Sequence, residues 1–374
     1  MPVTGAWRPG DEPGHRRFVR VFGRPHVLEA GGRLRDVDIA YETWGTLDAR
    51  AANAVLVLHA LTGDSHVAGP AGPGHRQAGW WDAMVGPGKP IDTDRYFVVC
   101  PNVLGGCQGT TGPASPAPDG RPYGSRFPLI TIRDQVVAEA ALADALGIAR
   151  WAAVVGGSMG GMRVLEWAVG FPDRVASAVV IACGATASAE QIALCSLQTR
   201  AIQADPKYRG GEYYDAAPGD GPHQGLSLAR GIGQVSYRSE AELEMRFGHK
   251  PQGDENPLAG GRYAVESYLD YHGTKLARRF DANTYVVLSN AMNHHDVGRG
   301  RGGTASALAR ITAEVTLAGI SSDRLYPLRL QHELVAAIPR ATGVDIVQSP
   351  SGHDGFLVES EAVGKVISRA LTSV

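Results

Sequence analysis

Short, mostly apolar runs rich in β-branched residues recur along the chain. The clearest lie at residues 54–58, 96–100, 151–155, 176–182 and 314–320. Runs of this length with little polar alternation are typical of strands that are buried on both faces of a parallel sheet. The sequence therefore predicts an α/β fold around a mostly parallel central sheet.

The segments between these runs supply the helices that such a sheet needs. Residues 132–146 are rich in Ala, Val and Leu and lie between two strand runs, which predicts a right-handed crossover connection. Amphipathic stretches at 161–169 and at about 327–341 predict two further helices. A last strand is expected at 344–348, followed by a C-terminal helix.

The α/β alternation is interrupted between residues 186 and 305. This segment is polar and helix-compatible, with Gly/Pro breaks at 218–219, 221–222 and 298–303. We interpret it as a helical lid inserted into one core. The expected division is residues 1–185 for the first part of the core, 186–305 for the lid and 306–374 for the second part of the core.

Composition excludes several classes of protein. With 44% hydrophobic and 20% charged residues among 374, the chain can bury a large core. A net charge of -2 gives no basic excess for nucleic acid or for an anionic membrane surface. Apolar runs stay well short of the roughly 20 residues that span a bilayer, and the first residues do not resemble a signal peptide. We expect a cytoplasmic protein without nucleic-acid or membrane partners.

The four cysteines have no CxxC spacing and no histidine at zinc-site spacing. They are Cys100, Cys107, Cys183 and Cys195. This pattern favours ordinary buried thiols over a disulfide or a metal site. No metal is therefore expected.

Gly156-Gly-Ser158-Met-Gly160 matches the G-x-S-x-G pattern, with a predicted strand before it and a predicted helix after it. In that context the serine occupies a sharp strand-to-helix turn, and the flanking glycines let strand and helix approach closely. The motif predicts an α/β-hydrolase fold in which Ser158 is the nucleophile.

A serine nucleophile needs a base and an acidic group that orients the base. Asp323 follows the strand run that ends at Ile320, and His353 follows the last predicted strand. Both positions lie at the sheet edge that carries Ser158, in the chain order that this fold uses. We expect a Ser158–Asp323–His353 triad.

The other candidate residues are expected to have different roles. His294, His295 and Asp296 fall in the predicted lid beside Gly/Arg-rich sequence, where lid surface or lid packing is expected. His332 lies on a predicted helix. His59 follows a strand and is expected to shape the loop that stabilises the oxyanion.

Acyl transfer also needs backbone donors for a tetrahedral oxyanion. The amide after the nucleophile, that of Met159, is one candidate. Leu61, in the loop after residues 54–58, is the other, with the adjacent Thr62 amide as its competitor.

At this point the residues resemble a known family, the homoserine O-acetyltransferases of methionine biosynthesis, over nearly the whole chain. The matching segments are Tyr41-Glu-Thr-Trp-Gly45, His59-Ala-Leu-Thr-Gly-Asp64, Asn102-Val-Leu-Gly-Gly-Cys-Gln-Gly-Thr-Thr-Gly-Pro113, Gly156-Gly-Ser-Met-Gly-Gly161, Arg279-Arg-Phe-Asp281, His295-Asp-Val-Gly-Arg299 and Ser322-Asp-Arg-Leu-Tyr-Pro327.

The resemblance implies the same triad and places substrate contacts at Arg230 and Asp354, with Tyr237 and Thr62 beside them. A guanidinium suits the carboxylate of homoserine, and a carboxylate suits its ammonium. The resemblance also implies acetyl-CoA as co-substrate, no bound cofactor and a homodimer.

Three alternatives stay open. Relatives with the same motifs transfer succinyl groups or accept serine, and a carboxylic-ester hydrolase would use the same triad with water as acceptor. A long lid favours a bound alcohol over water as the acyl acceptor, because it can exclude water from the acyl-enzyme, although lipases also have lids. A binding module without catalysis is disfavoured because all three triad residues are present.

Overall fold

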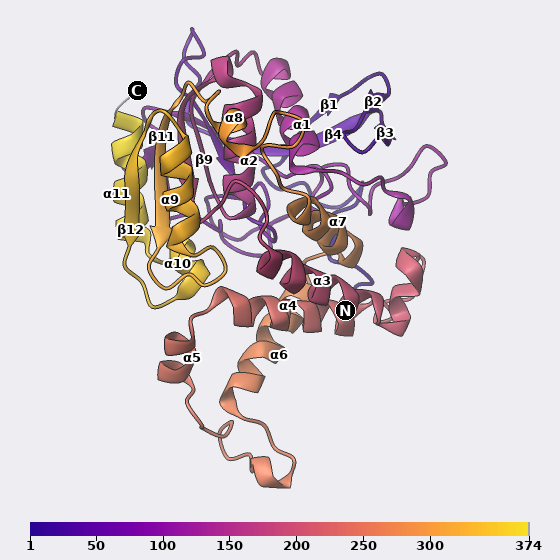
Figure 1. The fold of residues 1–374 in the computed structure, drawn as a ribbon. Coiled ribbons are helices and arrows are strands. Elements are labelled where there is room, and N and C mark those ends of the chain that lie inside the picture. The colour runs from indigo at the N-terminus through magenta and orange to yellow at the C-terminus, as the bar shows by residue number, and fades with distance from the viewer. Residues whose placement is uncertain (373–374) are drawn as a thin grey trace.

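The computed structural model describes residues 1–372, which build an eight-stranded sheet with helices on both faces (Figure 1). The strands, in spatial order, are β1 (Arg17–Val21), β4 (Val37–Trp44), β8 (Phe97–Pro101), β5 (Ala54–Leu58), β9 (Trp151–Gly157), β10 (Val175–Ile181), β11 (Glu314–Ile320) and β12 (Ala341–Val347). Neighbours from β8 to β12 are parallel, whereas β4 is antiparallel to both β1 and β8. The predicted mostly parallel α/β sheet is confirmed.

Each face of the sheet has its own hydrophobic core. Leu56 and Val154 belong to the core that also holds residues of α1 (Ile132–Ala145), α2 (Met159–Gly170) and α9 (Leu328–Ala337). Their neighbours Val55 and Val155 belong to the opposite core, with α11 (Ser360–Thr372). Every residue of β5 and β9 is buried, which explains why these strands lack polar alternation in the sequence.

Two sequence predictions need correction at the C-terminal part of the sheet. The helix expected to reach Ala341 ends at Ala337, because Ile338 already has extended backbone angles. The last strand begins at Ala341 rather than Val344 and ends at Val347. The sequence analysis also missed β1 and β4 and the two short strand pairs. These pairs are β2 (His26–Val27) with β3 (Arg33–Leu34) and β6 (Val85–Gly86) with β7 (Ile91–Asp92).

The segment between β10 and β11 is helical, as expected. Its helices are α3 (Ala189–Gln203), α4 (His223–Tyr237), α5 (Glu240–Arg246), α6 (Ala264–Ala277), α7 (Ala282–Asn293) and α8 (Thr304–Leu308). In Figure 1, α5 and α6 project away from the sheet while α7 lies back beside it, and α4 packs between α3 and α6. The expected boundary between residues 305 and 306 falls inside α8.

Short elements complete the chain. They are the 3₁₀ turns η1 (Gly124–Arg126), η2 (Pro172–Arg174), η3 (Pro206–Gly211), η4 (Pro257–Ala259) and η5 (Gly352–Asp354), and the one-turn helix α10 (Gly355–Val358).

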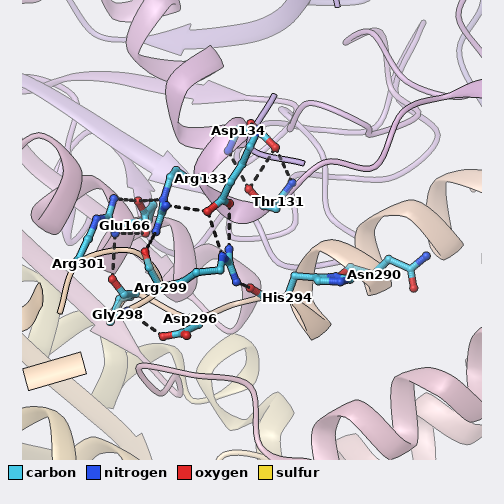
Figure 2. Close-up of polar contacts among 12 residues, drawn as sticks. Thr131, Arg133, Asp134, Glu166, Asn290, His294, Asp296, Gly298, Arg299 and Arg301 are labelled. Carbon is cyan, nitrogen blue, oxygen red and sulfur yellow. Dashed lines mark hydrogen bonds and ion pairs between the residues drawn. The ribbon is translucent and has the colours of Figure 1, made fainter. Parts of the chain in front are cut away.

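A polar network fastens the end of the insertion to the core (Figure 2). Arg301 and Arg133 both pair with Glu166 of α2, and Arg299 pairs with Glu29. Arg133 of α1 also pairs with Glu29 at 2.7 Å and donates to the carbonyl of Arg299 at 3.1 Å. The network therefore joins residues 299–301 to α1 and α2.

His294, His295 and Asp296, the other candidate residues of the insertion, lie away from the catalytic cavity. His295 is buried, and its Nε2 lies 3.0 Å from the carbonyl of Gly184. Asp296 accepts a hydrogen bond from the amide of Gly298 at 2.8 Å, and His294 is exposed. These residues pack the end of the insertion, in agreement with the sequence analysis.

The four cysteines are buried free thiols, as expected. Burial raises the pKa of Cys107 to about 12, so this thiol stays protonated at neutral pH. Within residues 1–372, we find no helix that combines the length and the hydropathy needed to cross a membrane.

Candidate active site

Ser158 occupies a strained turn between β9 and α2. Its backbone has φ 57° and ψ -124°, a conformation that is costly for a residue with a side chain. The turn is held because the Ser158 amide donates to the carbonyl of Ile181 at 3.0 Å. A Cβ on Gly160 would lie 2.1 Å from the carbonyl oxygen of Leu58, so only glycine lets α2 approach β5 this closely.

Asp323 and His353 form a buried pair. Asp323 Oδ2 lies 2.7 Å from His353 Nδ1, and both side chains are at most 4% exposed. Asp323 Oδ1 accepts hydrogen bonds from the amides of Leu325 and Tyr326 at 2.9 and 2.8 Å, which fixes the carboxylate. Because the ionised carboxylate only accepts, Nδ1 carries a proton and Nε2 is left as the basic nitrogen of His353.

The surroundings of His353 favour its protonated form. Burial alone would lower the pKa of His353, but the charge and the hydrogen bond of Asp323 outweigh burial and raise it above its ordinary value of 6.5. The ring of Tyr326 stacks on the imidazole at 4.9 Å, and Phe356 meets it edge-on at 5.5 Å. These contacts hold the orientation of the base.

The structure brings most of the predicted site residues to one cavity of about 110 Å³. Its wall includes Ser158, His353, Leu61, Thr62, Arg230, Tyr237 and Asp354. Of the two other predicted residues, Asp323 lies behind His353, and Met159 begins α2 directly after the serine. The insertion supplies Arg230 and Tyr237, so the cavity lies between the core and the insertion.

Arg230 is the cation of this cavity wall. It lies on α4 with its guanidinium 5.3 Å from the ring centre of Tyr237, within cation–π range. Among residues 1–372 it has no carboxylate partner within ion-pair distance. Burial raises the pKa of Tyr237 despite the nearby Arg230, so the phenol stays neutral. An unpaired guanidinium in the wall of this cavity is suited to an anionic group.

Two residues of the site were missed by the sequence analysis. Arg238 pairs with Asp354 at 3.2 Å and also with Glu242. The hydroxyl of Tyr326 is buried in the cavity wall without a hydrogen-bond partner. Tyr326 lies in one of the segments that carry the family resemblance. No local pattern connects Arg238 to the site, because Asp354 is distant in the sequence and the nearby partner, Glu242, lies outside the cavity wall.

His59 has a structural role, because it fixes the loop that follows β5. His59 Nε2 accepts the amide of Val103 at 3.0 Å, and burial together with Arg163 lowers the pKa of His59 to about 3. Arg279 donates to the carbonyl of Thr62 at 2.8 Å. These contacts hold Leu61 and Thr62 beside Ser158, and both amides remain candidates for the oxyanion.

Glu42, His66 and His75 gather close enough to be considered as metal ligands. However, the two imidazoles are stacked at 3.8 Å with only 12° between their planes. The in-plane lone pairs of two parallel rings cannot converge on one ion at ordinary ligand distances. Glu42 instead pairs with His66 at 2.9 Å, which raises the pKa of His66 against the effect of burial. This cluster is organised as a buried ion pair.

Comparison with known proteins identifies relatives that have the same fold family. The family described as alpha/beta hydrolase fold matches residues 53–360. The homoserine O-acetyltransferase of Thermobifida fusca (strain YX) is 60% identical over 371 residues, which cover 99% of this chain and 97% of that protein.

Solved structures of two enzymes resemble this structure over nearly the whole chain. The crystal structure of homoserine O-acetyltransferase from Bacillus anthracis has a TM-score of 0.86 at 27% identity and covers 95% of this chain and 97% of its own. Esterase E22 has a TM-score of 0.86 at 26% identity, covering 95% of this chain and 99% of its own.

The family resemblance in the sequence is thus confirmed by full-length similarity, and the predicted fold is confirmed by both sequence and structure. The chain belongs to the homoserine O-acetyltransferase family, which is built on the α/β-hydrolase fold.

Proposed function

We propose that this enzyme transfers an acetyl group from acetyl-CoA to the hydroxyl of L-homoserine through an acetyl-Ser158 intermediate. The observation that carries the proposal is the joint placement of Ser158, His353 and an unpaired Arg230 in one small cavity. A nucleophile, a base and a cation for the acceptor's carboxylate meet there.

In the first half-reaction, His353 Nε2 takes the proton of Ser158 as Oγ attacks the thioester carbonyl. The amide of Met159 and that of Leu61 or Thr62 donate to the oxyanion. When the C–S bond breaks, the proton on His353 passes to the sulfur and CoA leaves as a thiol. Asp323 keeps the imidazole oriented and stabilises its cationic form.

In the second half-reaction, the hydroxyl of homoserine attacks the acetyl-serine and gives its proton to His353. The tetrahedral intermediate collapses, Ser158 recovers that proton and O-acetylhomoserine leaves. Arg230 binds the substrate carboxylate, and Asp354 binds the ammonium while it remains paired with Arg238. Tyr237 and Thr62 line the cavity beside the substrate.

The cavity wall favours acetyl over succinyl as the acyl group. Apart from Arg230, its residues carry no guanidinium or ammonium, so a succinyl carboxylate would compete with the acceptor for one cation. Similarity to esterase E22 keeps ester hydrolysis as the second candidate. A hydrolase would deliver water to the acyl-enzyme, whereas the Arg230 and Asp354 pair suits a zwitterionic alcohol.

A homodimer is part of the proposal. Leu228 of α4 and Met245 of α5 are 59% and 68% exposed, so the insertion offers apolar side chains for a two-fold contact. The mass in solution at micromolar concentration tests this assignment. A cytoplasmic location is favoured by the acyl-CoA donor and by the four free thiols.

The deciding experiment supplies acetyl-CoA or succinyl-CoA together with homoserine, serine or water, and follows free thiol and product. We expect O-acetylhomoserine as the main product. With acetyl-CoA alone, intact-mass analysis should detect one added acetyl group, and this group should be absent from Ser158→Ala. Faster thiol release with water than with homoserine would instead identify a hydrolase.

A further inference from the structure

Two further hollows lie next to the catalytic cavity, and each shares lining residues with the one before it. The first is a cavity of about 330 Å³ that shares Thr62 with the catalytic cavity and is lined by Asp64, Trp80 and Gln108, among others. The second is a surface groove that shares Arg76, Gln77 and Arg279 with the first. The three hollows thus adjoin in a row that begins at Ser158 and ends on α6.

The outer groove concentrates positive charge on a protein whose net charge is -2. Its wall contains Arg76, Arg262, Lys275, Arg278 and Arg279, against one acidic residue, Asp270. Arg262 is already neutralised because it pairs with Glu255 at 2.7 Å and with Asp270 at 3.3 Å.

The other four cations have no carboxylate within ion-pair distance in the part of the chain that the structure describes. Arg76 donates to the backbone carbonyl of Arg278 at 2.7 Å, which brings these two guanidinium-bearing residues together. Arg279 is partly exposed, and desolvation lowers its pKa even though the charge of Asp64 acts in the opposite direction. Cations gathered in this way repel one another unless an anion joins them.

We propose that this groove binds the phosphate-bearing nucleotide end of the acyl-CoA donor, with the donor's pantetheine arm lying in the 330 Å³ cavity. This inference rests on the proposed function. The thioester must reach Ser158 while the nucleotide stays outside, and the row of hollows extends from Ser158 to the outer groove. Arg76, Lys275 and Arg278 are exposed at its outer end and present multiple donors to phosphate oxygens.

The test compares two donors, acetyl-CoA and S-acetylpantetheine, which share the thioester and the arm but differ in the nucleotide. For Lys275→Glu and Arg278→Glu we expect the KM for acetyl-CoA to rise about tenfold, as for the loss of a charge-assisted hydrogen bond. The KM for S-acetylpantetheine and the KM for homoserine should not change.

Arg24→Glu is the matched control, since it makes the same change of charge on an exposed residue beside β2, on the side of the molecule away from α6 (Figure 1). Equal KM values for acetyl-CoA in Arg278→Glu and Arg24→Glu would overturn the inference, as would an equal rise for both donors. Calorimetry of CoA and pantetheine with the same variants gives a readout that needs no turnover.

The outcomes separate the two proposals. If the wild-type enzyme transfers acetyl from neither donor to homoserine, the proposed function fails. Calorimetry of CoA with the variants still tests whether the groove binds the nucleotide. If it transfers acetyl from both donors with the same KM, the function stands and the groove assignment is wrong.

Discussion

The guanidinium of Arg238 lies 3.2 Å from the carboxylate of Asp354, and this ion pair joins the end of α4 to the turn that carries His353. A Cβ on Gly352 would meet the backbone of Tyr237 and Ser239 at 2.7 Å, so the two segments are in close contact here. The pair therefore links α4, which carries Arg230, to the turn that carries His353.

From this pair we predict that Arg238→Ala raises the KM for homoserine about tenfold, because Asp354 loses the partner that orients it. Arg246→Ala is the matched control, since Arg246 pairs with Glu242 as Arg238 does but has no ion pair with Asp354. Steady-state kinetics with Arg238→Lys should recover part of the loss. An unchanged KM in Arg238→Ala would mean that Asp354 is oriented without Arg238.

Arg230→Ala should raise the KM for homoserine by about 10- to 100-fold and leave the KM for acetyl-CoA nearly unchanged. The guanidinium is the cation available to the acceptor's carboxylate in the cavity, and a charge-assisted hydrogen bond of this kind contributes about 1.5–3 kcal/mol. Initial rates with each substrate varied in turn measure both constants. Equal rises in the two constants would remove Arg230 from the acceptor site.

The raised pKa of His353 predicts where kcat/KM decreases on the acidic side of its pH profile. His353 must be neutral to act as a base, so kcat/KM should fall as the pH drops through a pKa that lies above 6.5. Asp323→Asn removes the larger of the two charges that raise this pKa. The charge of Asp354 remains, but burial is the largest single effect and opposes it, so the His353 pKa should fall below 6.5. Imidazole NMR titration measures the shift directly, and a pKa that stays above 6.5 in Asp323→Asn would contradict this assignment.

Local sequence was enough to predict the parts of the fold that local chemistry determines. β5 and β11 occupy the predicted residues because buried central strands need continuous apolar runs. Ser158 was identifiable because its strained turn requires glycines at fixed positions on either side. Asp323 and His353 followed from their places after strands at the same sheet edge.

The missed features depend on contacts between distant parts of the chain. β4 contains Glu42, a buried carboxylate that is tolerated because Ser65 and His66 bind it from another loop. Without those partners, a charged residue in the middle of a strand argues against burial. Arg238 was missed for the same reason, since its significance comes from Asp354 and not from its neighbours in sequence.

The final prediction concerns Glu166 and the network that fastens residues 299–301 to the core (Figure 2). Glu166 is 5% exposed and pairs with both Arg133 and Arg301, which are themselves mostly buried. Removing the carboxylate leaves two guanidinium groups without this partner in a poorly solvated place. We expect Glu166→Ala to lower the free energy of unfolding by about 3 kcal/mol.

Glu333→Ala is the matched control for this change. Glu333 forms an exposed pair with Arg329 on α9, with both side chains about 60% exposed, and such pairs contribute about 0.3–0.5 kcal/mol. Urea unfolding followed by fluorescence and circular dichroism compares the two variants under identical conditions. Because Glu166 does not line the catalytic cavity, the folded Glu166→Ala enzyme should keep its KM for homoserine. A loss of stability no greater than that of Glu333→Ala would show that water replaces the carboxylate and that the network does not fasten the insertion.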